Sequence, residues 1–113
     1  MNKTVHIIIK RSGVSNSVKH FIDYQNSLTE IAKNSNGFVK SDTFIKYEDN
    51  KKNNDKEKLS IISISKWNDL EHWNNFKESD KRLKVYNNYK ELIIKESLDI
   101  YDYKTNFNTT PLL

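Results

Sequence analysis

The side chains of this sequence that are best suited to acid–base chemistry are its three histidines, His6, His20 and His72. They are far apart and show neither the His-x-His nor the His-x3-His spacing of a metal site, so we expect no metal held by protein ligands alone. His6 stands in the apolar run from Val5 to Ile9, where a buried imidazole would stay neutral and act as a base. We therefore expect His6 to be catalytic, and the other two histidines to be solvated or singly hydrogen-bonded.

Several other kinds of chemistry lack the residues that they need. The sequence contains no cysteine, which excludes disulfides, thiolate metal sites and cysteine nucleophiles. Its two glycines, Gly13 and Gly37, are too few for a loop that cradles phosphates, and no serine-nucleophile signature is present. The sequence therefore argues against nucleotide or flavin binding through a glycine-rich motif.

The stretch from residue 63 to residue 80 carries the most informative pattern. Apolar and polar residues alternate up to Trp67, which is typical of a β-strand. Three apolar residues then recur at every third position, as on one face of a helix: Leu70, Trp73 and Phe76. Asn68 and Glu71 have the spacing of a capping box at the start of that helix. Trp67 thus stands at a corner between strand and helix, where its large side chain can form the floor of a cavity.

The remaining periodicities predict the fold class. Strands are expected over residues 4–10, 38–47, 58–67 and 97–104, with a turn at 11–13. Helical spacing predicts a first helix up to the Asn36-Gly37 stop, capped by Ser15 or Asn16, and a second helix broken at Ser79 and ending near residue 93. This β-α-β-β-α-β order predicts an α+β, ferredoxin-like antiparallel sheet with the helices on one face. The uncovered face predicts a symmetric homodimer, a dimeric α+β barrel.

Composition predicts one small domain, residues 1–104, followed by an arm or disordered tail at 105–113. The 113 residues are 35% hydrophobic and 30% charged, and the polar segment 50–56 is expected to link two strands. No apolar run approaches the roughly 20 residues of a membrane span, and the N-terminus is polar, so we expect a cytoplasmic protein without a membrane partner. The net charge of +4 is dispersed and only two residues are arginine, which argues against nucleic-acid binding.

The pattern of Gly13, Asn36-Gly37-Phe38 and Trp67-x5-Trp73-x2-Phe76-x2-Ser79 resembles the antibiotic biosynthesis monooxygenase (ABM) superfamily of dimeric α+β barrels. The resemblance covers about residues 4–104. Members of that family include cofactor-independent oxygenases of polycyclic phenols, haem-degrading monooxygenases and proteins of unassigned activity. The resemblance therefore implies a fold more strongly than any one reaction.

The resemblance also implies roles for individual residues. Trp67 matches the tryptophan that walls the ligand cavity in both the oxygenase and the haem-degrading branches, and core packing is its alternative role. Tyr86 stands where the haem-degrading branch has its iron-ligating histidine, and His6 stands where that branch has an asparagine facing the ligand. We expect a catalytic group of His6, Trp67 and Tyr86, with apolar pocket walls from Phe21, Trp73 and Phe76.

The function expected from this resemblance is a cofactor-independent monooxygenase acting on a small aromatic or polycyclic substrate. Such an enzyme needs a substrate that ionises and reduces dioxygen itself, in a pocket that is poor in water. Two alternatives are a non-catalytic dimeric barrel that binds a small apolar ligand or acts in stress response, and a haem-degrading monooxygenase. We do not favour haem, because Tyr86 replaces the histidine ligand and a neutral phenol is a poor ligand for iron.

Overall fold

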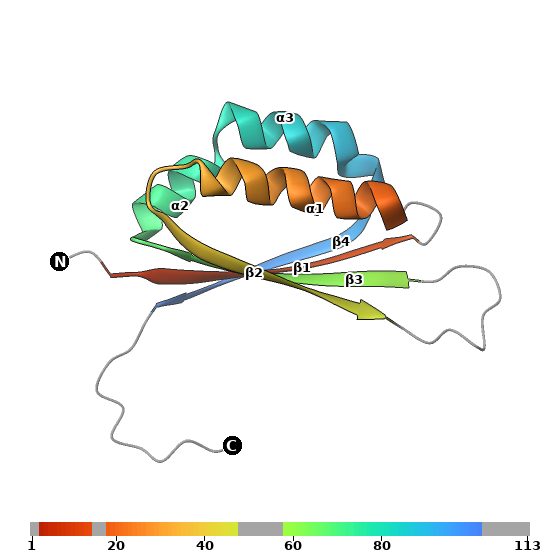
Figure 1. The fold of residues 1–113 in the computed structure, drawn as a ribbon, viewed down its shortest axis with the longest axis horizontal. Coiled ribbons are helices and arrows are strands. Elements are labelled where there is room, and N and C mark those ends of the chain that lie inside the picture. Colours follow the sequence, from red (N-terminus) through yellow and green to blue (C-terminus); the bar gives the residue numbers. More distant parts are fainter. Residues whose placement is uncertain (1–2, 15–17, 48–57, 103–113) are drawn as a thin grey trace, which may run out of the picture.

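The computed structural model describes residues 3–14, 18–47 and 58–102 (Figure 1). Four strands form one antiparallel sheet in the order β2-β3-β1-β4: β1 (Val5–Val14), β2 (Phe38–Tyr47), β3 (Lys58–Trp67) and β4 (Ile93–Asp102). The helices lie together on one face of this sheet: α1 (Val18–Lys33), α2 (Leu70–Lys77) and α3 (Asp80–Tyr89), which a short 3-10 helix, η2 (Lys90–Leu92), follows. The expected α+β, ferredoxin-like architecture is confirmed.

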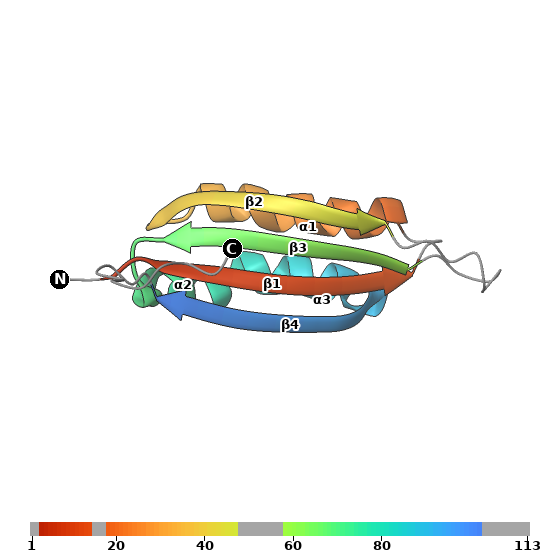
Figure 2. The ribbon, with the colours of Figure 1, turned by 90° about the horizontal axis from the view of Figure 1, so that it is seen from below.

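The register of the sheet decides which side chains face the helices. In β1, Val5, Ile7 and Ile9 are buried beneath the helices, because alternate residues of a strand point to opposite faces. Ile7 lies opposite Ser65 of β3 and Ile100 of β4, so these residues share the helix-facing side. Figure 2 views the sheet from its other side, with the helices behind it. That other side is called the open face below.

The helix ends differ in one respect from the sequence prediction. The N-cap of α2 is Asp69 and not Asn68. Asp69 Oδ1 accepts a hydrogen bond from the backbone N of His72 at 2.9 Å. The same oxygen lies 2.7 Å from Nδ1 of the His72 ring. The backbone N of Asn68 instead donates a hydrogen bond to the carbonyl of Gly37 at 2.7 Å. The predicted break at Ser79 is present, because the hydroxyl of Ser79 caps α3.

Two strand boundaries were also predicted wrongly. β1 runs through residues 11–13, where a turn was expected, because the charged Arg11 turns inward and pairs with Glu96 of β4. The last helix ends at Tyr89, and β4 begins at Ile93, which pairs with Gly13 in the sheet. Both errors have one physical cause. The pairing between β1 and β4 extends both strands, and it joins residues that are far apart in sequence, so local patterns do not reveal it.

The predicted stop after α1 is confirmed at Gly37. Its φ of +83° is the left-handed conformation that glycine adopts without a steric penalty. A Cβ at this position would also clash with the imidazole ring of His72. The glycine therefore allows the α1–β2 turn to pack closely against α2.

Three predictions fall on residues that the structure does not describe. These are the capping of α1 by Ser15 or Asn16, the linking segment 50–56 and the tail 105–113. Within the described part of the chain, none of the helices combines the length and the apolarity that a membrane span requires.

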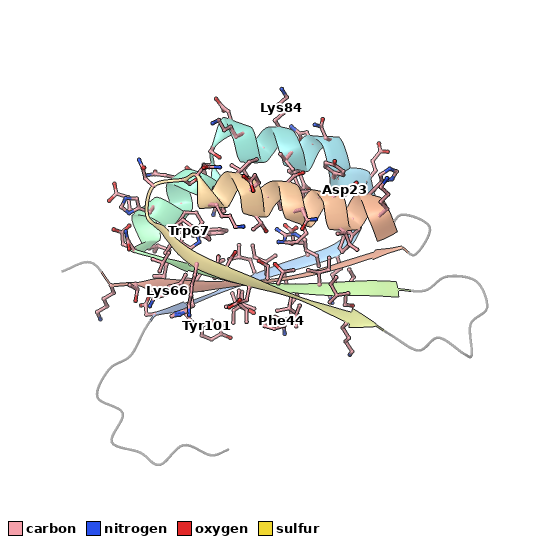
Figure 3. All side chains as sticks on the ribbon, viewed as in Figure 1. Asp23, Phe44, Lys66, Trp67, Lys84 and Tyr101 are labelled. Carbon is pink, nitrogen blue, oxygen red and sulfur yellow. The ribbon has the colours of Figure 1, made fainter. Side chains whose placement is uncertain are left out.

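The open face carries a group of apolar side chains that polar residues surround. Ile8 lies opposite Ile64, and Ile62 lies opposite Phe44, so these four form a strip across three strands. Phe44 and Tyr101 are 56% and 54% exposed, and Figure 3 shows both on the side of the sheet opposite Trp67. The helices cover only one face, as the sequence predicted.

Candidate functional site

A small cavity lies between the helix layer and the sheet. Its free space for water-sized molecules is ≈ 30 Å³, which is enough for about one or two waters. Residues from β1, β2, β3 and all three α-helices line it: Ile9, Arg11, Gln25, Leu28, Thr29, Ala32, Ser41, Ser63, Ser65, Trp67, Trp73, Phe76 and Arg82. We take this cavity as the candidate site because it brings aromatic, hydroxyl and charged side chains together in the interior.

One wall of the cavity is an aromatic cluster centred on Trp67, whose side chain is fully buried. Trp67 stacks on Phe76 with ring centroids 5.0 Å apart, and it meets Trp73 edge to face at 5.7 Å. Phe38 also contacts Trp67 edge to face, with ring centroids 5.5 Å apart. The indole Nε1 of Trp67 donates to Ser65 Oγ at 3.0 Å, which fixes the orientation of the ring.

The strand-to-helix corner explains why these rings meet. Trp67 is the last residue of β3 and faces the helices, while Trp73 and Phe76 lie three positions apart on the buried side of α2. The Asp69 cap sets where α2 begins and thereby directs that side onto Trp67. The local sequence is therefore sufficient to build this wall.

The opposite wall is polar and comes from residues far apart in the chain. Arg11 Nε donates to Glu96 Oε2 at 2.6 Å, and Arg11 Nη1 donates to Gln25 Oε1 at 2.7 Å. The Arg11 guanidinium also lies over the ring of Tyr24, 5.3 Å from its centroid. These contacts neutralise and orient a cation whose side chain is only 2% exposed.

Arg82 is a second cation in this interior. It projects from the first turn of α3 and is 9% exposed. Its Nη1 donates to the backbone carbonyl of Lys77 at 3.3 Å. Burial lowers the pKa of Arg82, while the nearby Tyr24 acts in the opposite direction. An arginine nevertheless remains protonated at neutral pH.

Two buried polar atoms have no hydrogen-bond partner among the described residues, Tyr24 Oη and Trp73 Nε1. Burial raises the pKa of Tyr24, partly offset by the positive charge of Arg11, so this phenol is neutral near pH 7. Buried donors without partners are uncommon in folded proteins and call for an explanation. Trp73 Nε1, whose residue lines the cavity, is available to donate to a bound molecule.

The structure brings together three of the six residues named from the sequence. Trp67, Trp73 and Phe76 line one cavity. Phe21 is buried but packs in a separate cluster with Ile61 and Ile22. Tyr86 is 37% exposed on α3 and is not among the residues that line the cavity.

His6 lies away from the cavity. Its neighbours in the sheet are Lys66 of β3 and Tyr101 of β4, and all three residues belong to the open face. Figure 3 shows Lys66 and Tyr101 on that side and Trp67 on the other. In this chain, His6 is therefore not placed to act as a base on a ligand beside Trp67. The apolar run around His6 left its face ambiguous, since a shift of one residue reverses a strand.

The polar half of the site was not predicted from the sequence. Arg11 falls in the turn expected at residues 11–13, and Gln25 falls in the first predicted helix, where its neighbours indicated no functional role. The alternation of β1 could have predicted that Arg11 points inward, because Arg11 continues the series Val5, Ile7 and Ile9 on the inner side of this strand. Among the described residues, no group of three or more histidine, aspartate or glutamate side chains is arranged to hold a metal ion.

Comparisons with known proteins identify the fold. No family model matches the sequence, and no curated protein matches it. SnoaB, a cofactor-independent oxygenase from Streptomyces nogalater, superposes with a TM-score of 0.69 at 13% identity over 95% of this chain and 99% of its own. A provisionally assigned antibiotic biosynthesis monooxygenase from Nitrosomonas europaea gives a TM-score of 0.70 at 11% identity over 97% of both chains.

A conserved protein from Methanosarcina mazei Go1 gives a TM-score of 0.64 at 19% identity over 90% of this chain and 94% of its own. At these identities the comparison establishes architecture and leaves activity open. The chain has the fold of the antibiotic biosynthesis monooxygenases, as the resemblance in its sequence implied.

Proposed function

We propose that this protein is a cofactor-independent monooxygenase whose small aromatic or polycyclic substrate binds against Trp67, Trp73 and Phe76. The observation that supports this proposal is the composition of the cavity, in which stacked aromatic rings face buried hydrogen-bond donors. Apolar walls with a few convergent polar groups are typical of small-molecule sites. The fold shared with SnoaB gives independent support.

The proposed reaction takes its electrons from the substrate. A methylene group between aromatic rings is oxidised to a carbonyl, so that CH₂ and O₂ give C=O and H₂O. One oxygen atom enters the product, and the other leaves as water with the two hydrogens of the methylene. The protein supplies a dry cavity and donors that stabilise the substrate anion. Since His6 faces away, stabilisation of that anion takes the place of a histidine base.

A bound substrate requires the cavity to widen, since ≈ 30 Å³ does not hold an aromatic ring system. The helix layer covers β4 incompletely. Leu98 and Ile100 are on the helix-facing side, opposite Ile9 and Ile7, yet are 37% and 44% exposed. We place the opening motion at this edge of the helix layer, where few buried contacts have to be broken.

Oxygen uptake with a model substrate tests the proposal. We expect the purified protein, without added cofactor or metal, to accelerate conversion of 1,8-dihydroxyanthrone to the anthraquinone with one O₂ consumed per molecule. The label from ¹⁸O₂ should appear in the new carbonyl. The Trp67→Ala variant should lose most of the rate above spontaneous oxidation. A rate equal to the protein-free control, for an anthrone that does bind, would contradict an oxygenase.

A non-catalytic ligand-binding barrel is the second candidate, and the position of His6 favours it. An enzyme requires a titratable group that reaches the ligand, whereas a binding protein requires only the apolar wall. The residues that line the cavity include no histidine, aspartate or glutamate. Ligand binding without oxygen uptake would identify this candidate.

The residues present do not fit haem. Tyr86, the position that the resemblance relates to an iron ligand, is exposed and does not line the cavity. We therefore derive no step through haem, and we expect no stoichiometric haem complex and no conversion to a bilin-like product.

A homodimer formed through the open face is part of the proposal. The apolar strip of Ile8, Ile62, Ile64 and Phe44 has no helix to cover it, and a second sheet would bury it. Light scattering at micromolar concentration should give twice the monomer mass, and a monomer mass would contradict this arrangement.

A further inference from the structure

The interior beside the cavity holds more positive than negative charge. Arg82 interacts electrostatically with two charged groups, Arg11 and Glu96, and with the phenols of Tyr24 and Tyr86. The two buried guanidinium groups and the carboxylate of the partly exposed Glu96 leave a net charge of +1 in this cluster. The Glu96 carboxylate already forms an ion pair with Arg11, so it mainly neutralises the charge of Arg11.

Arg82 is the cation whose partners are incomplete. A guanidinium has five N–H donors, and the described contact of this one is a 3.3 Å bond to a backbone carbonyl. A buried cation is costly unless an anion or several acceptors surround it. The indole of Trp73 lines the same cavity, with its Nε1 donor unpartnered and the residue 2% exposed. The cavity lining therefore includes two donor groups, the Arg82 guanidinium and the Trp73 indole N–H, that are available to an acceptor.

We infer that the cavity accepts its aromatic ligand as an oxyanion, a phenolate or carboxylate whose charged oxygen lies against the Arg82 guanidinium. The Trp73 indole N–H is a second donor to that oxygen, and the rings of Trp67 and Phe76 contact the apolar body of the ligand. This inference rests on the proposed small-molecule site and adds its charge preference. It also explains how a site without a nearby histidine favours an ionised substrate, because a cation stabilises the phenolate relative to the phenol.

A pair of naphthalene probes separates charge recognition from apolar binding. 4-Nitro-1-naphthol ionises with a change in visible absorption, and 1-nitronaphthalene has a similar body without the ionising group. Both are titrated into the wild-type protein and into Arg82→Met, which keeps an unbranched apolar side chain but removes the charge. The pKa of the bound naphthol is read from its absorption as a function of pH.

The inference predicts that the wild-type protein lowers the pKa of the bound naphthol by about one unit or more. The anion then binds about tenfold or more tighter than the neutral form. Arg82→Met should remove this preference while its affinity for 1-nitronaphthalene stays within about twofold of wild type. Arg82→Lys, which retains a charge without the planar fork, should keep part of the preference.

Two results would overturn the inference and are distinguishable from each other. If both probes bind but the naphthol pKa is unchanged, or is lowered equally in Arg82→Met, the charge preference is wrong and the apolar site stands. If neither probe binds the wild-type protein, the proposed site fails and the inference fails with it. Circular dichroism and thermal melting test whether Arg82→Met is folded. If Arg82→Met does not fold, the naphthol titration of Arg82→Lys is compared with that of the wild-type protein instead.

Discussion

The indole of Trp67 stacks on the phenyl ring of Phe76, with centroids 5.0 Å apart and planes inclined by 30°. Trp67 is fully buried, so its removal takes away both a part of the core and a wall of the cavity. We predict that Trp67→Ala lowers the free energy of unfolding by about 3–5 kcal/mol. Trp67→Phe, which keeps a ring against Phe76, should lose clearly less. Urea denaturation measures both, and equal losses would show that the stacked ring is not the stabilising element.

The ion pair between Arg11 and Glu96 joins β1 to β4 across the inner side of the sheet, with a distance of 2.6 Å. Glu96→Gln would remove the negative charge beside the buried Arg11 cation and leave it only neutral amide acceptors, among them Gln25. We predict a loss of about 2 kcal/mol in the free energy of unfolding, moderated because Glu96 is still partly exposed to water.

Asp99→Asn provides the matched control for this pair. Asp99 lies on the same strand but on the open face, opposite Ile8, and is exposed. Its substitution should change the free energy of unfolding by no more than about 0.5 kcal/mol. If both substitutions had the same effect, the ion pair between Arg11 and Glu96 would make no specific contribution.

Tyr24 presents a buried hydroxyl without a partner among the described residues. Tyr24→Phe removes that hydroxyl and keeps the ring beneath Arg11. We predict that the protein without ligand is unchanged or more stable by up to about 1 kcal/mol. A loss of more than about 1 kcal/mol in urea denaturation would mean that the hydroxyl is hydrogen-bonded in solution.

The same variant isolates a dependence of stability on alkaline pH. Burial raises the pKa of Tyr24 in the folded state, so the unfolded chain releases this proton first as the pH rises. The stability that it contributes is complete below the unfolded value of about 10 and is lost as the pH rises through the folded value. The wild-type protein should therefore lose stability relative to Tyr24→Phe above about pH 10, and parallel curves would contradict the shift.

His6 faces away from the cavity, so its substitution should not affect a ligand there. We predict that His6→Ala binds 1-nitronaphthalene with an affinity within about twofold of wild type. A tenfold loss of affinity with an unchanged melting temperature would show that His6 contributes to the ligand site. That result would require a different arrangement of β1. Because His6 lies on the open face, the oligomeric mass of the variant should be measured alongside.

The parts of the structure that the sequence predicted correctly depend on local patterns. Alternation in 38–47 and 58–67 predicted β2 and β3 with the observed bounds, and three-residue spacing after Trp67 predicted the aromatic side of α2. These features follow from backbone geometry over a few neighbouring residues. They account for the fold and for the apolar wall of the site.

The polar wall depends instead on contacts between distant residues. Arg11 and Glu96 are 85 positions apart, and each reads as an exposed charge when its neighbours alone are considered. Arg82 similarly belongs to a helix of mostly polar residues, and its burial depends on α3 packing against the interior. The sequence pattern therefore predicted the hydrophobic half of the site and missed the charged half.

Fluorescence offers the most direct measurement of the proposed site, since the two tryptophans of the chain, Trp67 and Trp73, both line the cavity. We predict saturable quenching of their emission by 1-nitronaphthalene with one site per chain. Ser63→Leu, which fills the cavity from β3, should weaken that binding by about tenfold or more, and Ser60→Leu on the open face of the same strand should not. Absence of saturable quenching, or equal binding by Ser63→Leu and the wild-type protein, would contradict a ligand site between the helices and the sheet.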